Sequence, residues 1–166
     1  MRTIIFSITV LLGFATLVSA TELPLPKGPV ILKISGDIKH TNIDGAAHFD
    51  LPMMEALAGR QTVIETPWYS GTIFFDGPLI SAILEAVGAG GDTLRVVALN
   101  DYAAEIPRSD VENYPVILAT RIDGEVISVR DKGPAFVIYP FDIAPELYNE
   151  MIFSRSVWQV GAIEVF

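Results

Sequence analysis

The chain has 166 residues, a formal net charge of −9 and no cysteine. Nucleic acids and anionic lipid surfaces attract basic patches, so this acidic charge argues against both as partners. The missing cysteine excludes a nucleophilic thiol, a zinc–thiolate site and an iron–sulfur cluster. The two histidines, His40 and His48, are too few for a histidine-rich metal site, so we predict no metal centre.

The first twenty residues have the pattern of a secretory signal peptide. One charged residue, Arg2, precedes an apolar run from Ile4 to Val18, and Val18-Ser19-Ala20 suits signal peptidase. The run is shorter than the roughly 20 apolar residues of a membrane-spanning helix, which disfavours an uncleaved membrane anchor. We therefore expect a Sec-type signal peptide at 1–20, a periplasmic location, no membrane insertion after cleavage, and a single domain over 21–166.

The first half of that domain predicts strands and two helices. Alternating apolar residues from Val30 to Ile34 indicate a half-buried strand that ends at Ser35-Gly36, followed by a polar loop that carries both histidines. Asp50 is expected to cap a short helix that Gly59 ends. Strands are expected at 62–65 and 72–75. The clearest helix has Pro78 at its first position, an apolar face from Leu79 to Val87, and Gly88 as its C-terminal cap.

The second half predicts mostly strands. Asp123-Gly124 is a strong signal for a two-residue hairpin turn between two of them. Many short strands with two or three short helices indicate an α+β domain built mainly on antiparallel or mixed sheet. The expected strands are 94–99, 116–122, 125–129, 136–139 and 157–165.

Four loops between these elements hold residues suited to binding. If the loops converge, aromatic faces, carboxylates and three cations would surround one ligand. This combination favours a flat heteroaromatic ligand. Trp68 or Trp158 would stack on the ring. Hydrogen bonds from the N–H groups at the ring's edge could be accepted by the carboxylates of Glu65, Asp101 or Asp131. An anionic tail of the ligand could pair with Arg130, Lys132 or Arg155.

Structural interpretations compete with these roles. Trp158 stands at strand spacing from Val160 and Ala162, which favours a place in the core, whereas Trp68 in a turn suits core and site equally. By default the run 130–132 would be a solvated hairpin end. His48, two residues before a helix cap, is more typical of a surface residue than of a ligand.

Taken in order, several short segments resemble the sulfite-oxidase-type molybdopterin-binding domain. The resemblance covers nearly all of residues 21–166 and is closer to the small stand-alone exported members. Some of these are periplasmic pterin-binding proteins that work with a membrane-bound diguanylate cyclase/phosphodiesterase in cyclic-di-GMP signalling. The segments are Lys27-Gly28-Pro29-Val30-Ile31-Leu32, Phe49-Asp50-Leu51, Thr66-Pro67-Trp68, Val97-Ala98-Leu99-Asn100-Asp101-Tyr102, Ile106-Pro107, Arg130-Asp131-Lys132-Gly133-Pro134 and Ser154-Arg155-Ser156-Val157-Trp158-Gln159.

The resemblance implies a sulfite-oxidase-type fold and a pterin pocket. In the enzymes of this family a cysteine ligates molybdenum, but the corresponding segment here, 64–68, contains no sulfur. Carboxylate and hydroxyl groups replace a soft thiolate poorly, so molybdenum is not expected. The implied pocket residues are Asn100, Asp101 and Tyr102, with Arg130, Asp131, Lys132, Arg155 and Ser156 around the pterin and its side chain.

From the sequence we expect a periplasmic pterin-binding protein that signals ligand occupancy to a membrane-bound diguanylate cyclase/phosphodiesterase. No catalytic residue is assigned. One alternative is a molybdopterin-dependent oxidoreductase without the cysteine ligand. Another is a partner-binding domain that takes no small ligand.

Overall fold

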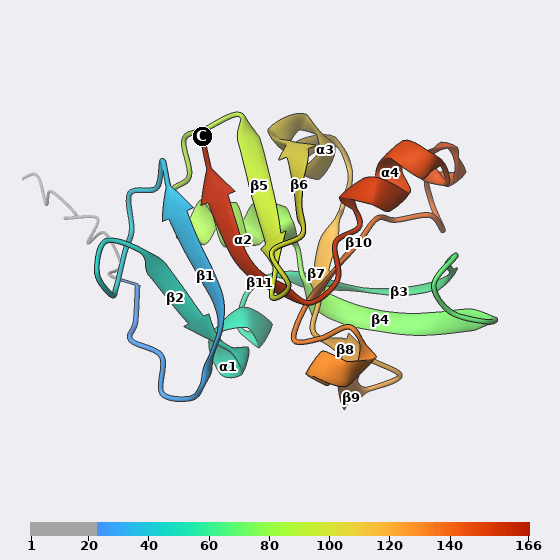
Figure 1. Ribbon diagram of the computed structural model, residues 1–166, viewed down its shortest axis with the longest axis horizontal. Helices are drawn as coiled ribbons and strands as arrows, with labels where there is room; N and C mark the ends of the chain where they lie inside the picture. Colours follow the sequence, from blue (N-terminus) through green and yellow to red (C-terminus); the bar gives the residue numbers. More distant parts are fainter. Residues whose placement is uncertain (1–22) are drawn as a thin grey trace, which may run out of the picture.

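The computed structural model describes residues 23–166, so the predicted signal peptide lies outside the described residues. The largest sheet has the strand order β2-β1-β11-β5-β6, in which β1 and β11 run parallel and every other neighbouring pair is antiparallel (Figure 1). Its strands are β1 (Val30–Gly36), β2 (Ala47–Asp50), β5 (Thr93–Ala98), β6 (Ala103–Pro107) and β11 (Val160–Val165).

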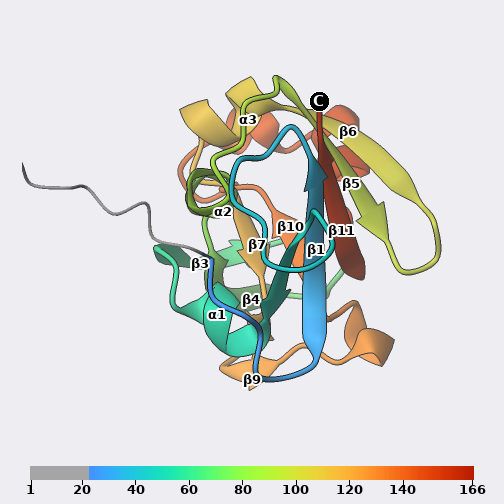
Figure 2. The ribbon, with the colours of Figure 1, turned by 90° about the vertical axis from the view of Figure 1, so that its left-hand side faces the viewer.

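One face of this sheet is buried. In β1, the fully buried Leu32 and Ile34 flank the exposed Lys33, and in β5 the fully buried Leu94 and Val96 follow the same alternation. Successive side chains of a strand point to opposite faces, so this pattern means that one face carries the core. Helix α2 (Ile80–Ala86) lies against that face, together with the two smaller sheets (Figures 1 and 2).

The smaller sheets build the other half of the molecule. In the β3-β4-β8-β9 sheet, β3 and β4 form a long hairpin, and Asp123 and Gly124 turn β8 into β9 with φ angles of 50° and 84°. This confirms the predicted hairpin turn, because a type I′ turn has positive φ at both central residues. The strands are β3 (Gly59–Glu65), β4 (Thr72–Pro78), β8 (Arg121–Ile122) and β9 (Glu125–Val126), with β7 (Ile117–Ala119) and β10 (Phe136–Ile138) in a separate pair.

One cluster of buried apolar side chains joins all three sheets. Its largest fully buried members include Phe49 from β2, Phe75 from β4, Phe136 from β10 and Tyr139 just after β10. Full burial of a large apolar side chain contributes about 1.5 to 3 kcal/mol relative to exposure. The core therefore holds the strand ends that carry the functional loops at fixed positions.

The helices are short. Within residues 23–166, none of them is both long and apolar enough to cross a membrane. The α2 helix ends at Ala86, and the predicted Gly88 follows its C-cap residue Val87 with a φ of 60°, the left-handed conformation that glycine adopts past a helix end. The remaining helices are α1 (Leu51–Glu55), α3 (Arg108–Asn113), α4 (Glu150–Arg155) and the 3-10 turns η1 (Val129–Asp131) and η2 (Pro145–Leu147).

Asp50 caps α1 as predicted, and the hydrogen bonds to its carboxylate make the fold sensitive to acid. Its carboxylate accepts hydrogen bonds from the backbone N–H groups of Gly28 (2.8 Å), Met53 (3.0 Å) and Lys27 (2.7 Å). These bonds, that from Gly28 first, hold the pKa of Asp50 below its ordinary value of 3.8. A lowered pKa stabilises the fold above pH 3.8, and this stabilisation is lost as the pH falls through the folded-state pKa.

We therefore expect the urea midpoint of the wild-type protein to fall between pH 6 and pH 2, and that of Asp50→Asn to fall less steeply. The asparagine retains the size of the cap and one acceptor oxygen but does not titrate. Urea titrations followed by tryptophan fluorescence across this pH range measure the difference. Parallel declines in the two proteins would show that Asp50 is not a source of the acid sensitivity.

Two predicted helix boundaries were wrong because strand pairing overrides the local signal. Pro78 does not start α2. It ends β4 opposite Gly59, and Leu79 stays extended with its N–H bonded to the Ala58 carbonyl at 2.9 Å. Gly59 does not end α1, which stops at Glu55. It begins β3, where a Cβ would lie 2.7 Å from the Gly77 carbonyl oxygen.

Three predicted strands were too long. The segment 116–122 divides at Thr120 because β7 pairs with β10 while β8 pairs with β4. The strand expected at 157–165 starts only at Val160, since Gln159 has a φ of 54°. The strand expected at 125–129 ends at Val126, before η1. Four elements were not predicted from the sequence, all of them with six residues or fewer: β2, β6, α3 and α4.

Candidate functional site

A cavity of about 320 Å³ lies where the end of β5, the start of β11, α4 and the β3–β4 loop meet. Small-molecule sites in proteins typically measure about 300 to 1,000 Å³, so this cavity has room for a compact ligand. Its walls come from three separate parts of the chain. The lining residues are Trp68, Ala98, Asn100, Tyr102, Phe153, Ser154, Ser156, Val157 and Trp158.

Four of the nine lining residues are aromatic. The Trp68 ring is packed edge-on against Phe136, Phe153 and Trp158, with centroid separations of 5.1, 5.8 and 6.4 Å. Trp68 is partly buried in this cluster, whereas Trp158 is 39% exposed. The structure thus corrects the preference for Trp158 as a core residue, because the positive φ of Gln159 takes Trp158 out of the β11 ladder and leaves it at the cavity.

The polar groups of the wall are all uncharged. The Tyr102 hydroxyl donates to the Ser154 carbonyl at 3.0 Å, and the Asn100 side-chain oxygen accepts from the Tyr102 N–H at 3.1 Å. The hydroxyls of Ser154 and Ser156 donate to the carbonyls of Met151 (2.7 Å) and Ile152 (2.9 Å). Since each hydroxyl donates its single proton to the backbone, its oxygen can accept from a ligand, and the Asn100 amide nitrogen can donate.

Of the predicted binding residues, the structure brings Trp68, Asn100, Tyr102 and Ser156 together in this cavity. Asp101 belongs to the same turn but is exposed, has a φ of 66° and does not line the cavity. The chemistry of the wall is therefore less charged than the sequence predicts.

The predicted run Arg130, Asp131 and Lys132 lies beside the cavity instead of lining it. The Asp131 carboxylate accepts from the Ser128 hydroxyl at 2.6 Å, and its carbonyl accepts from the Tyr69 hydroxyl at 3.2 Å. The Lys132 ammonium lies 4.3 Å from the centre of the Tyr69 ring. Burial, then the charge of Asp131, raises the pKa of Tyr69, so this tyrosine is a neutral donor. Arg130 is exposed.

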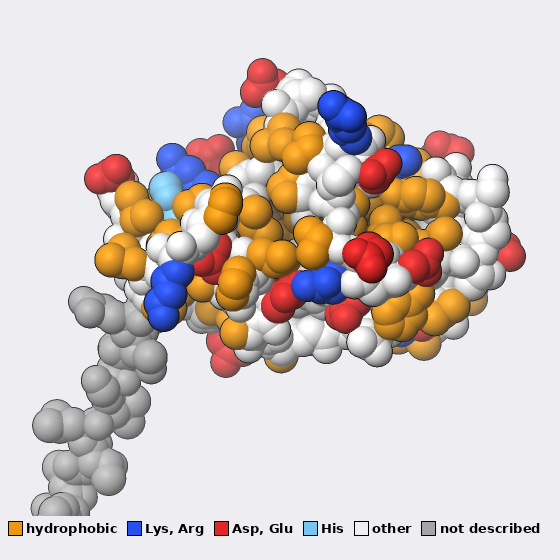
Figure 3. Space-filling model, turned by 90° about the horizontal axis from the view of Figure 1, so that it is seen from below, with side chains coloured by type: hydrophobic (Ala, Val, Ile, Leu, Met, Phe, Trp, Pro, Cys, Tyr) orange, Lys and Arg blue, Asp and Glu red, His pale blue; other side chains and the backbone are white. Residues whose placement is uncertain are grey.

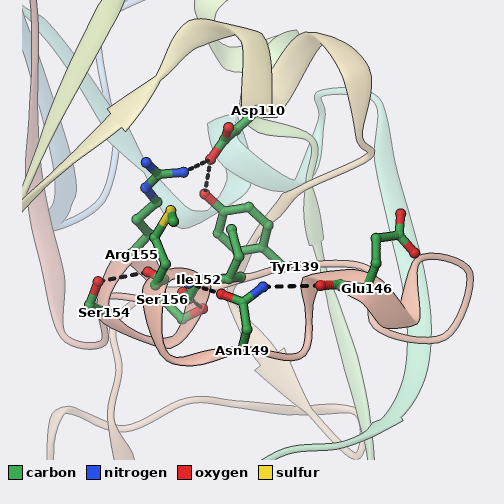
Figure 4. Close-up of polar contacts among 9 residues, drawn as sticks. Asp110, Tyr139, Glu146, Asn149, Ile152, Ser154, Arg155 and Ser156 are labelled. Carbon is green, nitrogen blue, oxygen red and sulfur yellow. Dashed lines mark hydrogen bonds and ion pairs between the residues drawn. The ribbon is translucent and has the colours of Figure 1, made fainter.

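The Arg155 side chain points toward α3 and does not line the cavity. Its guanidinium lies 2.9 Å from the Asp110 carboxylate, which also accepts from the Tyr139 hydroxyl at 2.8 Å (Figure 4). Burial, then the bond to Asp110, raises the pKa of Tyr139 well above its usual range, so its hydroxyl remains a donor. This Asp110–Arg155–Tyr139 cluster attaches α4, and with it one wall of the cavity, to the rest of the fold.

Glu65 lies at the end of β3 and faces a different groove, described below. Four lining residues were not predicted as site residues: Ala98, Phe153, Ser154 and Val157. The capping pattern of Asn149, whose side chain accepts from the Ile152 N–H at 3.2 Å, could have indicated α4 and hence Phe153. Ala98 has no side-chain feature that could have marked it.

The residues present do not fit a molybdenum-bearing pterin cofactor. The chain has no thiolate to offer, and residues 23–166 contain no cluster of three or more His, Asp or Glu side chains arranged to hold a metal ion. A cofactor phosphate would also need cations, whereas the cavity lining contains none. The wall instead suits an uncharged planar ring.

No protein-family model matches the chain, and no curated protein sequence does so significantly. Among solved structures, the chain is similar to the sulfane dehydrogenase SoxCD from Paracoccus pantotrophus, with a TM-score of 0.58 and 15% sequence identity. The match covers 81% of this chain and only 37% of the dehydrogenase chain. The likeness concerns the fold. It confirms the predicted α+β class, with mainly antiparallel and mixed sheets in a sulfite-oxidase-like arrangement.

Proposed function

We propose that the protein is a periplasmic pterin-binding protein that reports ligand occupancy to a membrane-bound diguanylate cyclase/phosphodiesterase. The observation that carries ligand binding is the cavity, in which Trp68, Trp158 and Tyr102 offer aromatic faces while Asn100 and Ser156 offer uncharged polar groups. Stacking on aromatic rings and a few placed donors and acceptors suit the faces and edge of a pterin ring.

Separate observations support the rest of the proposal. The pattern of the first twenty residues supports export, and the resemblance to the exported pterin-binding proteins supports the signalling role. The missing cysteine and the uncharged lining favour a bound pterin without metal over a molybdenum cofactor. In this role the chain binds and orients its ligand and performs no reaction.

Ligand binding can be tested on protein purified from the periplasm of an expression host. We expect mass spectrometry and fluorescence of the released ligand to identify a pterin. A reduced pterin added at about 100 times its Kd should stabilise the fold by about 2.7 kcal/mol. A chain of this size would then show an increase in Tm of roughly 5 to 10 °C. The absence of both a copurified pterin and a thermal shift would contradict the proposal.

The likeness to a sulfane dehydrogenase favours an oxidoreductase as the second candidate. Elemental analysis of the same periplasmic protein separates the two candidates. Stoichiometric molybdenum would contradict the pterin sensor and favour a cofactor-bearing enzyme. A protein with neither pterin nor metal would be left as a partner-binding domain.

A further inference from the structure

A second hollow, of about 340 Å³, separates β3 from the segment 141–148, and we call it the β3-edge groove. Its wall includes Val63, Ile64 and Glu65 of β3 and, from the facing segment, Phe141, Pro145 and Tyr148. We propose that this groove docks an extended segment of a partner protein that carries both apolar and basic side chains. The proposal rests on the proposed function, since the partner would be the membrane protein that receives the ligand signal.

The backbone of β3 is open toward the groove. Strand β3 pairs with β4 on one side, and no described strand pairs with its other edge. Val63, Glu65 and the β4 residue Thr72 share one face of the sheet, whereas Ile64 points to the opposite face, so the groove extends from that face around the outer edge of β3. An open edge presents backbone N–H and C=O groups to which an extended peptide can add as a further strand.

Apolar side chains are available along that edge. Val63 is 56% exposed, and Tyr148 is exposed on the facing segment. Phe141 is buried beneath them, with its ring centre 5.3 Å from that of Tyr148. Side chains of an added strand that lie beside Val63 and Tyr148 would meet this apolar surface, which favours apolar residues there.

The charge around the groove favours basic residues in the added segment, because Glu65 lies on the same face of β3 as Val63. Between Lys132 and Arg155 the chain carries acidic residues and no lysine or arginine. The nearest cation on β3, Arg60, is already paired with Asp142. Glu65 and Glu146 are exposed on the two sides. In Figure 3 acidic side chains lie among the hydrophobic ones at the end of the molecule that carries the β3–β4 hairpin.

An aromatic contact joins the groove to the ligand cavity. Phe153 lines the cavity, and its ring centre lies 4.8 Å from that of Tyr148 and 6.0 Å from that of Phe141. A ligand that moves Phe153 would therefore displace the wall of the groove, because closely packed rings cannot shift independently. The contact provides a physical route from ligand occupancy to partner affinity.

The test uses two fluorescein-labelled heptapeptides, one of alternating lysine and valine and one with glutamate in place of lysine. Fluorescence anisotropy with the exported chain should show binding of the lysine peptide that is at least about 10-fold tighter, or about 1.4 kcal/mol. This preference should weaken with added salt. Equal affinity for the two peptides, or no binding of either, would overturn the proposal.

A matched pair of variants locates the binding site. Val63→Lys places a cation at the groove and should weaken lysine-peptide binding by at least about 10-fold. Val126→Lys makes the same change at a 48% exposed position on β9, outside the groove, and should alter the affinity by less than about 2-fold. Circular dichroism checks that both variants are folded. Equal losses in the two variants would show that the peptide binds through net charge alone.

Measuring pterin affinity in the same proteins separates this proposal from the proposed function. Peptide binding without pterin binding would support the docking proposal and contradict the proposed sensor function. Pterin binding without peptide binding would contradict the docking proposal alone. If both ligands bind, a saturating reduced pterin should change the peptide Kd by about 5-fold or more. An unchanged Kd would overturn the link through Phe153.

Discussion

Replacing Asp110 with alanine is expected to lower the free energy of unfolding by about 3 kcal/mol, because it leaves the Arg155 guanidinium and the Tyr139 hydroxyl without their acceptor. The side chains of Asp110 and Arg155 are only 17% and 22% exposed, so water replaces the lost contacts poorly. For a chain of this size the Tm should fall by roughly 10 °C, which differential scanning calorimetry measures.

A surface ion pair provides the control for this prediction. Arg95 and Glu164 lie 3.6 Å apart, and both side chains are about half exposed. Glu164→Ala should therefore cost no more than about 1 kcal/mol. Asp110→Asn, which retains an acceptor oxygen, should fall between the two alanine variants. Similar losses for Asp110→Ala and Glu164→Ala would mean that the Asp110–Arg155–Tyr139 cluster contributes no more than a surface pair.

Replacing Trp158 with alanine is expected to weaken pterin binding by about 1 to 3 kcal/mol, on the scale measured for bases stacked on aromatic side chains. This corresponds to roughly a 5- to 150-fold increase in Kd. Trp158 is 39% exposed but packs edge-on against Trp68 and Phe136, so its removal should also lower the stability of the ligand-free protein, by less than the removal of Trp68 does. Isothermal titration with a reduced pterin, together with thermal unfolding of the ligand-free variant, measures both effects.

Two further variants separate stacking from general damage. Leu99→Ala removes an exposed side chain from the neighbouring turn, outside the cavity lining, and should leave the Kd unchanged. Trp68→Ala removes a ring packed against three other aromatic rings, so it should reduce both affinity and stability. If Trp158→Ala binds the pterin as tightly as Leu99→Ala does, the ring of Trp158 is not a stacking platform.

The sequence predicted local features well where a single segment determines the outcome. Asp50 caps α1, Gly88 follows α2, and Asp123-Gly124 turns β8 into β9, each through bonds or φ angles set within a few residues. Element boundaries failed where a distant segment decides them. The β3–β4 pairing that keeps Pro78 out of α2 is one example, because its hydrogen bonds join residues far apart in the chain.

The candidate site shows the same division. The types of residue that the site would use, and the turn that carries Asn100 and Tyr102, were readable from sequence. Which side chains remain available was not, because a side chain's partners depend on packing between distant elements. Arg155 shows this most clearly, since its pairing with Asp110 across 45 positions removes a cation that the sequence had assigned to the ligand.

The sequence by itself determined that this protein has no thiol chemistry and belongs to the α+β class, because these properties follow from composition and from the periodicity of short segments. Only the tertiary structure decided that the cavity is aromatic and uncharged, and that Trp158 lies at its wall. Charged groups pair with the nearest opposite charge in space, and aromatic rings pack where strand ends and helices meet, so both depend on contacts that sequence separation does not reveal.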